Sequence, residues 1–336
     1  VYGYGVEEDV EEFPVHRGWN PPGARKLRAG PSWAKPLQDA ALVQSLTRVC
    51  REHRVDAAGA HNYEALLVAL AARVRPIVYH AHNAMTDELP HYFRHGWPAR
   101  MVGAWLDRHF PRIADALIVP HARLRNYLVE QGCVPERVHV VPPALDVTPF
   151  EPAPVGGPRP VVLYAGNVDA YQNLSLLDDA MARVRSQRPE TRLVIATTAR
   201  NKSGFAGATV EYTPDFADMR MALQRDAVFV CPRTSWSGYP IKLLNAMAAG
   251  LPVVCCAGSA YPVVDRQTGL IVADNDAAAL ADALLQLLKD PARRAAMGVA
   301  GRAHVLEHHA PPNIGLQISS VYANVIDGGL VSVKGR

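Results

Sequence analysis

Along most of this chain, short apolar runs of strand length alternate with longer stretches in which apolar residues recur every three or four positions. The first pattern predicts buried strands, and the second predicts amphipathic helices. Strands that alternate with helices are typical of a parallel sheet covered by helices on its faces. The sequence therefore predicts an α/β fold.

The expected elements form two series, separated by a proline-rich stretch at residues 142–160. The first series comprises a helix over 36–53, a strand over 55–60, a helix from 63, strands over 76–80 and 116–119, a helix to about 131 and a strand over 138–141. The second comprises strands over 161–165, 192–196, 208–212, 227–231 and 253–256, and helices from 174, from 216, over 240–249, 277–289, 291–308 and from about 311 to 326.

A proline-rich stretch between two such series indicates a linker between domains. We expect an N-terminal Rossmann-like domain over residues 1–148 and a C-terminal Rossmann-like domain over 158–310. A last helix and tail, 311–336, is expected to pack back towards the first domain. The residues before Leu37 lack the apolar strand and turn with which such a domain normally opens, so we expect that its first strand and helix are missing.

Size and charge narrow the class of protein. A length of 336 residues exceeds what one core usually supports, and 49% hydrophobic with 20% charged residues is typical of a globular protein. The net charge of +3 comes from interspersed charges, which argues against a nucleic-acid partner. The five cysteines are scattered and mostly lie in apolar segments, so we expect buried thiols and a cytoplasmic location.

Two segments bear on membranes. Residues 243–264 carry no charge, but two glycines and two prolines interrupt them, so we expect a buried helix, turn and strand and no transmembrane segment. Residues 92–97 combine aromatic and basic side chains. This combination suits either peripheral contact with the inner face of a membrane or the end of a helix.

One segment is more specific than the rest. Residues 237–254, SGYPIKLLNAMAAGLPVV, resemble the signature of glycosyltransferase family 4, the large group of retaining GT-B glycosyltransferases. Other segments are similar to the family in the same order, covering roughly residues 55–325: IVYHAHN at 77–83, ADALIV at 114–119, VVPPALD at 140–146, LYAGNV at 163–168 and GLIV at 269–272.

The resemblance implies a GT-B architecture, in which two Rossmann-like parallel-sheet domains face each other across a cleft. The C-terminal domain would bind a nucleoside diphosphate sugar, and the N-terminal domain would present a glycan, lipid-linked or small-molecule acceptor. Closure of the domains would exclude water. Retention would proceed by front-face attack, with the departing phosphate taking the acceptor proton, so no protein nucleophile, metal or other cofactor is expected. The implied role is in polysaccharide or glycoconjugate assembly.

The chain departs from the family pattern around the expected donor site. A pair of glutamates brackets the signature helix in the family, and Ser237 and Asn245 stand at those positions here. An asparagine still hydrogen-bonds a ribose hydroxyl, but without charge assistance, at a cost of about 1 kcal/mol. The family clamps the diphosphate with an arginine and a lysine, and Asn167 and Gln172 stand at or near those positions. Gly166 beside them either lets the backbone approach a phosphate or forms a simple turn.

Other groups are therefore expected to bind the diphosphate. Helix N-termini bind anions, so the backbone amides of Gly238 and Tyr239, just before the signature helix, are candidates. Lys242, Arg200 and Lys202 are candidates for the lost cationic contacts. The alternative for each of the three is an ordinary solvated surface base.

Histidines dominate the expected acceptor side. By resemblance, His82 lies beside the transferred sugar and is the expected catalytic residue. His80 shares a strand face with it, and His61 ends the preceding strand, so both are expected to line the site. Packed structural histidines, or a metal-binding pair, are the alternatives. Asp87 and Glu88 either meet the acceptor or form a solvated loop pair.

The triplet Asp-Asn-Asp at residues 274–276 matches a manganese-binding pattern of another transferase fold. It directly precedes a predicted helix, and aspartate is a preferred N-cap residue. We therefore expect Asp276 to cap that helix and expect no metal site there.

Two other functions remain open. A non-catalytic GT-B protein that binds nucleotide or glycan would account for the departures at the donor site. A sugar-nucleotide epimerase would need an acid and a base placed to move a sugar proton, and no convincing pair is evident in the sequence. Release of nucleoside diphosphate only in the presence of an acceptor would distinguish a transferase from both.

Overall fold

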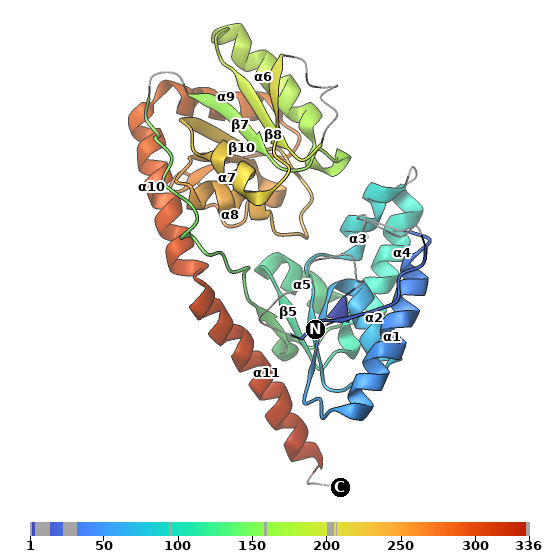
Figure 1. Cartoon of the computed structure of the whole chain (residues 1–336). Helices are drawn as coiled ribbons and strands as arrows, with labels where there is room; N and C mark the ends of the chain where they lie inside the picture. The colour runs from blue at the N-terminus through green and yellow to red at the C-terminus, as the bar shows by residue number, and fades with distance from the viewer. Residues whose placement is uncertain are drawn as a thin grey trace. The chain divides into compact units, whose positions relative to one another are not determined.

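The computed structural model describes residues 2–3, 14–22, 32–93, 96–157, 160–199, 205 and 207–333. Figure 1 shows its ribbon. The chain divides into two compact units. Unit 1 consists of Val1–Pro142 and Leu316–Arg336, and unit 2 consists of Pro143–Gly315. In sequence, unit 2 is therefore inserted into unit 1.

Unit 1 contains a 4-stranded parallel sheet in the order β3-β4-β5-β6. The strands are β3 (Ala58–His61), β4 (Ile77–His80), β5 (Ala116–Val119) and β6 (Val138–Val140). Every residue of β4 and β5 is buried, as expected of apolar strands covered on both faces. The register pairs His61 with His80 at the carboxyl ends of β3 and β4.

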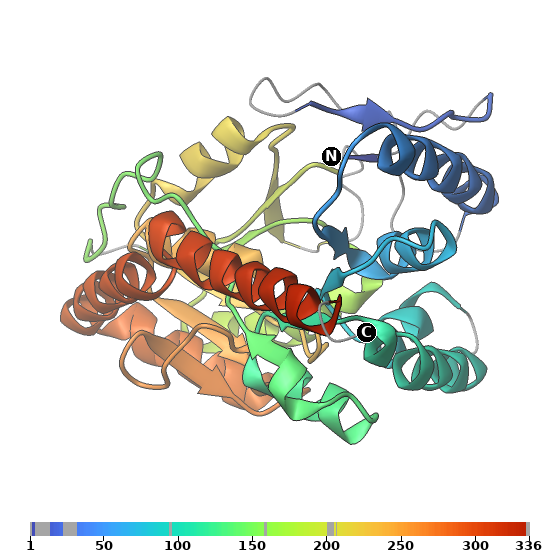
Figure 2. The ribbon, with the colours of Figure 1, turned by 90° about the horizontal axis from the view of Figure 1, so that it is seen from below.

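Helices and short turns complete unit 1. Its helices are α1 (Lys35–Glu52), α2 (Asn62–Ala71), α3 (Met85–Glu88), α4 (Gly96–His109) and α5 (Ala122–Glu130), with 3-10 turns η1 (Leu89–Tyr92), η2 (Pro111–Ile113) and η3 (Pro135–Arg137) and a small ladder of β1 (Tyr2–Gly3) and β2 (His16–Arg17). Helix α1 packs along α2 (Figure 2), and α2 packs against β3 and β4.

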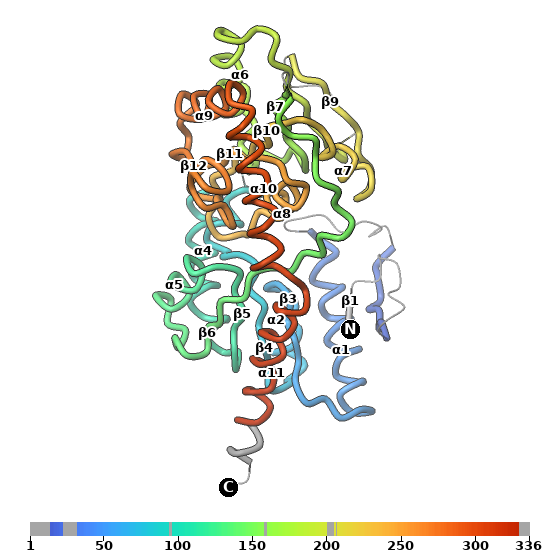
Figure 3. The backbone as a smooth tube through the Cα atoms, turned by 90° about the vertical axis from the view of Figure 1, so that its left-hand side faces the viewer, coloured from blue at the N-terminus to red at the C-terminus, as the bar shows by residue number. Residues whose placement is uncertain are grey.

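Helix α11 (Pro311–Val333) begins in unit 2 and ends in unit 1. Its C-terminal part lies beside β3 and β4 (Figure 3). The Tyr322 hydroxyl lies 3.0 Å from His80 Nε2. A side chain at position 59 would collide with the same hydroxyl, so Gly59 is what permits this close approach.

Unit 2 contains a 6-stranded parallel sheet in the order β12-β11-β10-β7-β8-β9. Its strands are β7 (Val161–Ala165), β8 (Leu193–Thr197), β9 (Ala208–Tyr212), β10 (Ala227–Cys231), β11 (Val253–Cys256) and β12 (Gly269–Val272). The chain builds outwards from β7 through β8 and β9, then returns to the other side of β7 with β10. Open parallel sheets bind ligands beyond the carboxyl ends of their strands at this reversal, which here lies between β7 and β10.

Helices cover both faces of the unit 2 sheet. One core cluster joins the sheet to α6 (Leu174–Gln187) and α9 (Ala277–Lys289). The other joins it to α7 (Phe216–Leu223), α8 (Ile241–Ala248) and α10 (Pro291–His308). Because helices cover both faces, the two strands that pair with β7 are apolar along their length. The single exception is Thr197, the last residue of β8.

Several local predictions are confirmed. The Asp276 side chain accepts a hydrogen bond of 2.9 Å from Ala279 N and caps α9. Helix α8 ends at Ala248, and Gly250, just after its cap, has a φ of +70° that suits glycine, with Gly250 N bonded to Met247 O and Leu251 N to Ala246 O. These two bonds form the Schellman motif that ends many helices. Cys133, Cys231, Cys255 and Cys256 are buried free thiols, and Cys50 is half-buried.

Residues 243–264 fold as most of α8, β11 and their connecting turns, as predicted. Within the described part of the chain, no helix has both the length and the apolarity to cross a membrane.

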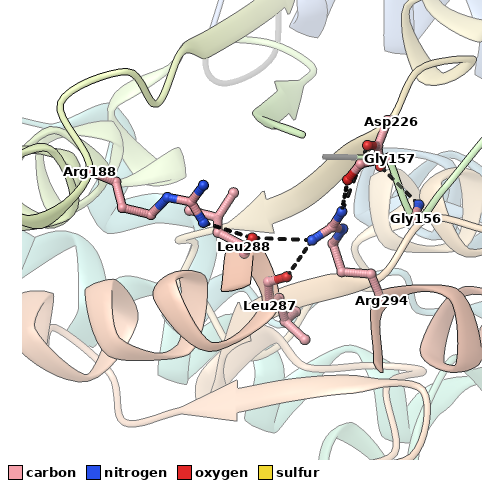
Figure 4. A network of polar contacts seen from close by, with 7 residues as sticks. All are labelled: Gly156, Gly157, Arg188, Asp226, Leu287, Leu288 and Arg294. Atoms are coloured by element: carbon pink, nitrogen blue, oxygen red, sulfur yellow. Dashed lines mark hydrogen bonds and ion pairs between the residues drawn. The ribbon is translucent and has the colours of Figure 1, made fainter. Parts of the chain in front are cut away.

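A buried arginine ties the start of unit 2 to its last helices (Figure 4). The guanidinium of Arg294 donates to the carbonyl oxygens of Leu287, Leu288 and Gly157 at 2.8, 3.2 and 2.5 Å. It also lies 3.7 Å from the Asp226 carboxylate, which accepts a hydrogen bond from Gly156 N. The Arg294 side chain thus hydrogen-bonds the carbonyl groups at the end of α9 and the linker residue Gly157, which precedes β7.

Candidate functional site

In unit 2, the candidate donor residues gather where the sheet order reverses. Gly166 directly follows β7 and has a φ of +145°, a conformation that side chains disfavour. A Cβ atom at this position would lie 3.0 Å from Lys242 Nζ. The turn therefore favours glycine, and the lysine amine lies directly beside it.

Lys242, from the first turn of α8, points back to the loop after β7. Its Nζ donates to the Tyr164 hydroxyl at 2.7 Å and to Gln172 Oε1 at 2.5 Å, and it lies 4.5 Å from the centre of the Tyr164 ring. Burial, together with the nearby Arg233 charge, lowers the pKa of Lys242 to about 8. An ammonium ion thus contacts Gln172, which stands where the family resemblance predicts a cation.

Hydrogen bonds organise the loop after β7. Gln172 Nε2 donates to Asn167 Oδ1 at 2.6 Å. Asn167 Nδ2 contacts Asp169 Oδ2 and the Tyr171 hydroxyl, both at 2.8 Å. The Tyr164 hydroxyl donates to the Asn167 carbonyl oxygen at 2.5 Å. The side-chain amides of Asn167 and Gln172 therefore hold the loop in one arrangement, together with the Asp169 carboxylate and the Lys242 ammonium group.

Arg233, which follows β10, is a site residue that sequence reasoning missed. Its Nη2 donates to Ser235 Oγ at 3.1 Å, and its guanidinium lies 5.4 Å from the centre of the Tyr171 ring. A Cβ atom at Gly238 would lie 2.6 Å from the same Nη2, so glycine leaves room for the guanidinium. Its Nε is buried and has no hydrogen-bond partner in the structure. The feature that could have identified Arg233 is its place in the sheet, because a residue directly after β10 lies where the strand order reverses.

The other predicted residues of the signature segment, Ser237, Tyr239 and Asn245, differ from one another in burial and in their contacts. Ser237 is buried, and Asn245 is only 9% exposed, with its Oδ1 buried and without a hydrogen-bond partner. The Tyr239 hydroxyl lies 3.3 Å from His309 Nε2, and its ring stacks on Tyr261. The side chain of Tyr239 therefore belongs to the packing between α8 and the end of α10. Arg200 and Lys202 lie outside the described residues.

In unit 1, the three predicted histidines lie together at the carboxyl ends of β3 and β4. The rings of His61 and His80 stack with their centres 4.1 Å apart. His61 Nδ1 lies 3.3 Å from His82 Nε2, a distance at which one nitrogen donates to the other. Strand β4 ends at His80, so His82 stands in the loop beyond it and is exposed, whereas His80 is buried.

Burial sets the charge of this histidine cluster. Burial, together with the neighbouring His61 and His82, lowers the pKa of His80 to about 3. The side chains of His61 and His82 are exposed, but the protein around them removes part of their hydration, which lowers the pKa values of both. The cluster is therefore neutral at physiological pH and able to hydrogen-bond hydroxyl groups as donor and acceptor. Tyr322, a partner of His80 from α11, was not predicted, because nothing local in sequence links the two residues.

Asp87 and Glu88 lie in α3, close to the loop that carries His82. Glu88 accepts hydrogen bonds from Asn83 Nδ2 and, at 3.1 Å, from the Tyr92 hydroxyl. Burial raises the pKa of the Glu88 carboxyl. Glu88 therefore organises the loop, and Asp87 is the half-buried carboxylate next to it.

The described residues contain no group of three or more His, Cys, Asp or Glu side chains that could hold a metal ion. Asp274, the other carboxylate of the Asp-Asn-Asp triplet, accepts a hydrogen bond from Gly258 N at 2.8 Å. Both carboxylates of that triplet thus bind backbone amides.

Family profiles match both units. The profile described as Glycosyltransferase Family 4 matches residues 5–148, and the profile described as Glycosyl transferases group 1 matches residues 159–290.

Known proteins are similar over much of the sequence. A phosphatidyl-myo-inositol mannosyltransferase of Mycobacterium leprae is 30% identical over 273 residues, which cover 78% of this chain and 70% of that protein. A GDP-mannose-dependent monoacylated alpha-(1-6)-phosphatidylinositol monomannoside mannosyltransferase of Corynebacterium glutamicum is 30% identical over 209 residues. That match covers 54% of this chain and 55% of the relative, so the chain spans about half of this relative's length.

A similar fold is found among solved structures. The sucrose-phosphate synthase of Thermosynechococcus elongatus superposes with a TM-score of 0.79 at 18% sequence identity. The match covers 96% of this chain and 86% of that one. At this identity the likeness concerns the fold.

Proposed function

Because this chain belongs to glycosyltransferase family 4, has the family's GT-B fold and is a glycosyltransferase, we propose that it transfers a sugar from a nucleoside diphosphate sugar to a hydroxyl acceptor. The Corynebacterium relative is named for its dependence on GDP-mannose, which supports a nucleoside diphosphate donor here. Both relatives are named for phosphatidylinositol derivatives, which favours a lipid-linked acceptor.

The observation that carries the proposal is the pair of cations at the reversal of the unit 2 sheet. Cleavage of a sugar phosphate bond builds negative charge on the departing diphosphate, and fixed positive groups stabilise it. Lys242 is fixed by Tyr164 and Gln172, and Arg233 by Ser235 and the Tyr171 ring. We assign to Lys242 and Arg233 the role that the family gives to the arginine and lysine missing from the loop after β7.

The neutral residues of the signature segment complete the proposed donor site. Asn245 Oδ1 is buried without a partner, which is costly for a polar atom unless a ligand group satisfies it. A ribose hydroxyl would donate a hydrogen bond to this oxygen. Gly166 and Gly238 carry no side chain that would displace the two cationic groups from these positions.

Transfer with retention needs no protein nucleophile. The acceptor hydroxyl attacks from the face that the diphosphate leaves, and a phosphate oxygen takes its proton. His82, neutral and exposed, would hydrogen-bond a hydroxyl of the transferred sugar. This role is consistent with the lowered pKa, because a neutral imidazole both donates and accepts.

A protein that binds nucleotide without turnover is the second candidate, and the replacements at Ser237, Asn245, Asn167 and Gln172 favour it. Charged side chains at these positions would strengthen donor contacts. The two candidates share the same donor site and differ only in whether acceptor-dependent release of nucleoside diphosphate follows.

The test begins with calorimetric titration of UDP, GDP, ADP, CMP and dTDP into the protein, followed by donor turnover with lipid-linked and soluble acceptors. We expect one nucleotide to bind, and Lys242→Met and Arg233→Met each to weaken it by roughly tenfold or more. Lys289→Met, an exposed lysine at the end of α9, is the matched control. Binding without turnover would support the second candidate, and no binding of any nucleotide would contradict both.

A further inference from the structure

Helix α4 has an inverted pattern, with small residues buried and large apolar residues facing solvent. Its buried residues are Ala99, Gly103 and Asp107, spaced at intervals of four. The side chains of Trp97, Met101 and Trp105, at the same spacing on another face, are 75%, 57% and 54% exposed. A surface helix normally shows the opposite arrangement.

The packing of the small face fixes this orientation. A side chain at Gly103 would collide with the backbone of Met85 in α3. Asp107 accepts hydrogen bonds of 2.9 Å from the backbone amides of both Met85 and Thr86, and a third from the Tyr127 hydroxyl. Turning the large residues inwards would break these bonds and produce that collision. The exposed aromatic face is therefore a stable feature of unit 1.

Basic residues flank the exposed apolar side chains. Arg100 and Arg108 are exposed on α4, and Arg112 is exposed just after it. Between residues 89 and 113 the only acidic residue in the sequence is Asp107, and it is buried. The surface formed by Trp97, Met101, Val102, Trp105, Arg100 and Arg108, here called the α4 face, is thus apolar and positively charged.

We propose that the α4 face docks onto an anionic lipid bilayer. Tryptophan side chains favour the boundary between headgroups and acyl chains, and arginine side chains beside them pair with anionic headgroups. The positive charge of the face complements such a surface, whereas a neutral bilayer would engage only its apolar residues. The proposal concerns binding and holds or fails independently of the transfer reaction.

The test is co-sedimentation of the full chain with vesicles of phosphatidylcholine alone and with an equimolar mixture of phosphatidylcholine and phosphatidylglycerol. We expect binding to the mixed vesicles, and a loss of roughly tenfold or more for the double variants Trp97→Ser/Trp105→Ser and Arg100→Gln/Arg108→Gln. Met221→Gln is the matched control, because Met221 lies in α7 of unit 2, is no part of the α4 face and is 66% exposed. It should bind as the unsubstituted chain does.

A second measurement needs no substitution. Bromine-labelled phosphatidylcholine in the mixed vesicles should quench tryptophan fluorescence if Trp97 and Trp105 enter the acyl region. Absence of binding to the mixed vesicles, or equal binding by the tryptophan double variant, would overturn the proposal. So would a dimer in sedimentation velocity that the same variant converts to monomer, because the face would then join two copies of the chain.

Discussion

The ammonium group of Lys242 is the titratable group with the most direct influence on an anionic donor. Burial lowers its pKa to about 8, and a bound diphosphate favours its charged form. We therefore expect nucleotide affinity to be constant below about pH 8 and to fall above it, by up to about tenfold per pH unit. Calorimetric titrations of the binding nucleotide across this range measure the effect.

Two variants separate the lysine from general effects of pH. Lys242→Met should bind more weakly and lose the dependence, whereas Lys289→Met should keep it. An unsubstituted protein whose affinity does not change through pH 8 would show that Lys242 is not a diphosphate ligand.

The neutral histidine cluster in unit 1 predicts acid sensitivity. The pKa of His80 is lowered to about 3 in the folded chain, against about 6.5 in the unfolded chain. Well above pH 6.5 the His80 ring is neutral in both the folded and the unfolded chain. As the pH falls below 6.5, the ring binds a proton in the unfolded chain but stays neutral in the folded one. At a pH of about 5 this costs about 2 kcal/mol of stability. Urea unfolding of unit 1 at neutral pH and at that pH should show the loss.

His80→Gln is the informative variant, because glutamine keeps a polar group near the Tyr322 hydroxyl but does not titrate. It should lose this part of the acid sensitivity while His61 and His82 keep theirs. If the free energy of unfolding fell equally with pH in the variant and in the unsubstituted chain, the acid sensitivity would come from other groups.

Single residues were predictable from sequence where their role is local. The cap at Asp276 and the helix end at Gly250 depend on neighbours within a few positions, and both were predicted. Arg233 and Tyr322 were not, because their roles arise from residues distant in sequence. Arg233 lies over the ring of Tyr171, in the loop after β7, and Tyr322 contacts His80, which is 242 positions away.

At the scale of elements, Arg294 connects α9, α10 and the segment before β7. Replacing it with methionine would remove its hydrogen bonds to three carbonyl oxygens and take away the cation beside the Asp226 carboxylate. Removing one partner of a fully buried charge pair costs about 3–5 kcal/mol, and the Asp226 carboxylate is 18% exposed, so we expect Arg294→Met to lower the free energy of unfolding of unit 2 by roughly 3 kcal/mol.

The neighbouring residue supplies the control in denaturant titrations. Arg293 contacts Gln286 at 3.3 Å on the surface, so Arg293→Met should change stability by less than about 0.5 kcal/mol. Equal effects of the two substitutions would mean that the Arg294 network contributes nothing specific.

Strands were easier to predict than helices with unusual faces. Buried parallel strands are continuous apolar runs, and β5, β7 and β10 were predicted with the bounds observed. Helix α4 was not predicted, because its buried face consists of an alanine, a glycine and an aspartate. Hydrophobic periodicity cannot detect a helix that buries small and polar residues. The strand at 55–60 was placed too early, since residues 55–57 precede the ladder, which begins at Ala58 and ends at His61.

At the scale of the molecule, the sequence predicted two α/β domains but not the order of strands in each sheet. Strand order follows from which apolar faces pack together, and hydrophobic runs alone do not encode it. This order matters for function, because the reversal between β7 and β10 brings Arg233 to the same edge as Gly166. The donor site could therefore be predicted only in part.

The described candidate residues for the donor site all belong to unit 2. We therefore expect a bound nucleotide to stabilise unit 2. A ligand that binds only the folded state slows local opening around its site. With the binding nucleotide at about 100 times its Kd, we expect amide hydrogen exchange in β10 and α8 to slow, by up to about 100-fold. The amides of β4 and β5 in unit 1 serve as the internal control, and protection confined to them would contradict the proposed site.

The insertion of unit 2 between the two segments of unit 1 also sets an order of assembly during synthesis. The ribosome completes Pro143–Gly315 before it produces Leu316–Val333, so unit 2 has all of its residues while unit 1 still lacks the last part of α11. Until Tyr322 emerges, His80 has no hydroxyl partner and the space above Gly59 is unfilled. Domains fold as units during synthesis. Unit 1, whose first segment is synthesised before unit 2, is therefore completed after it.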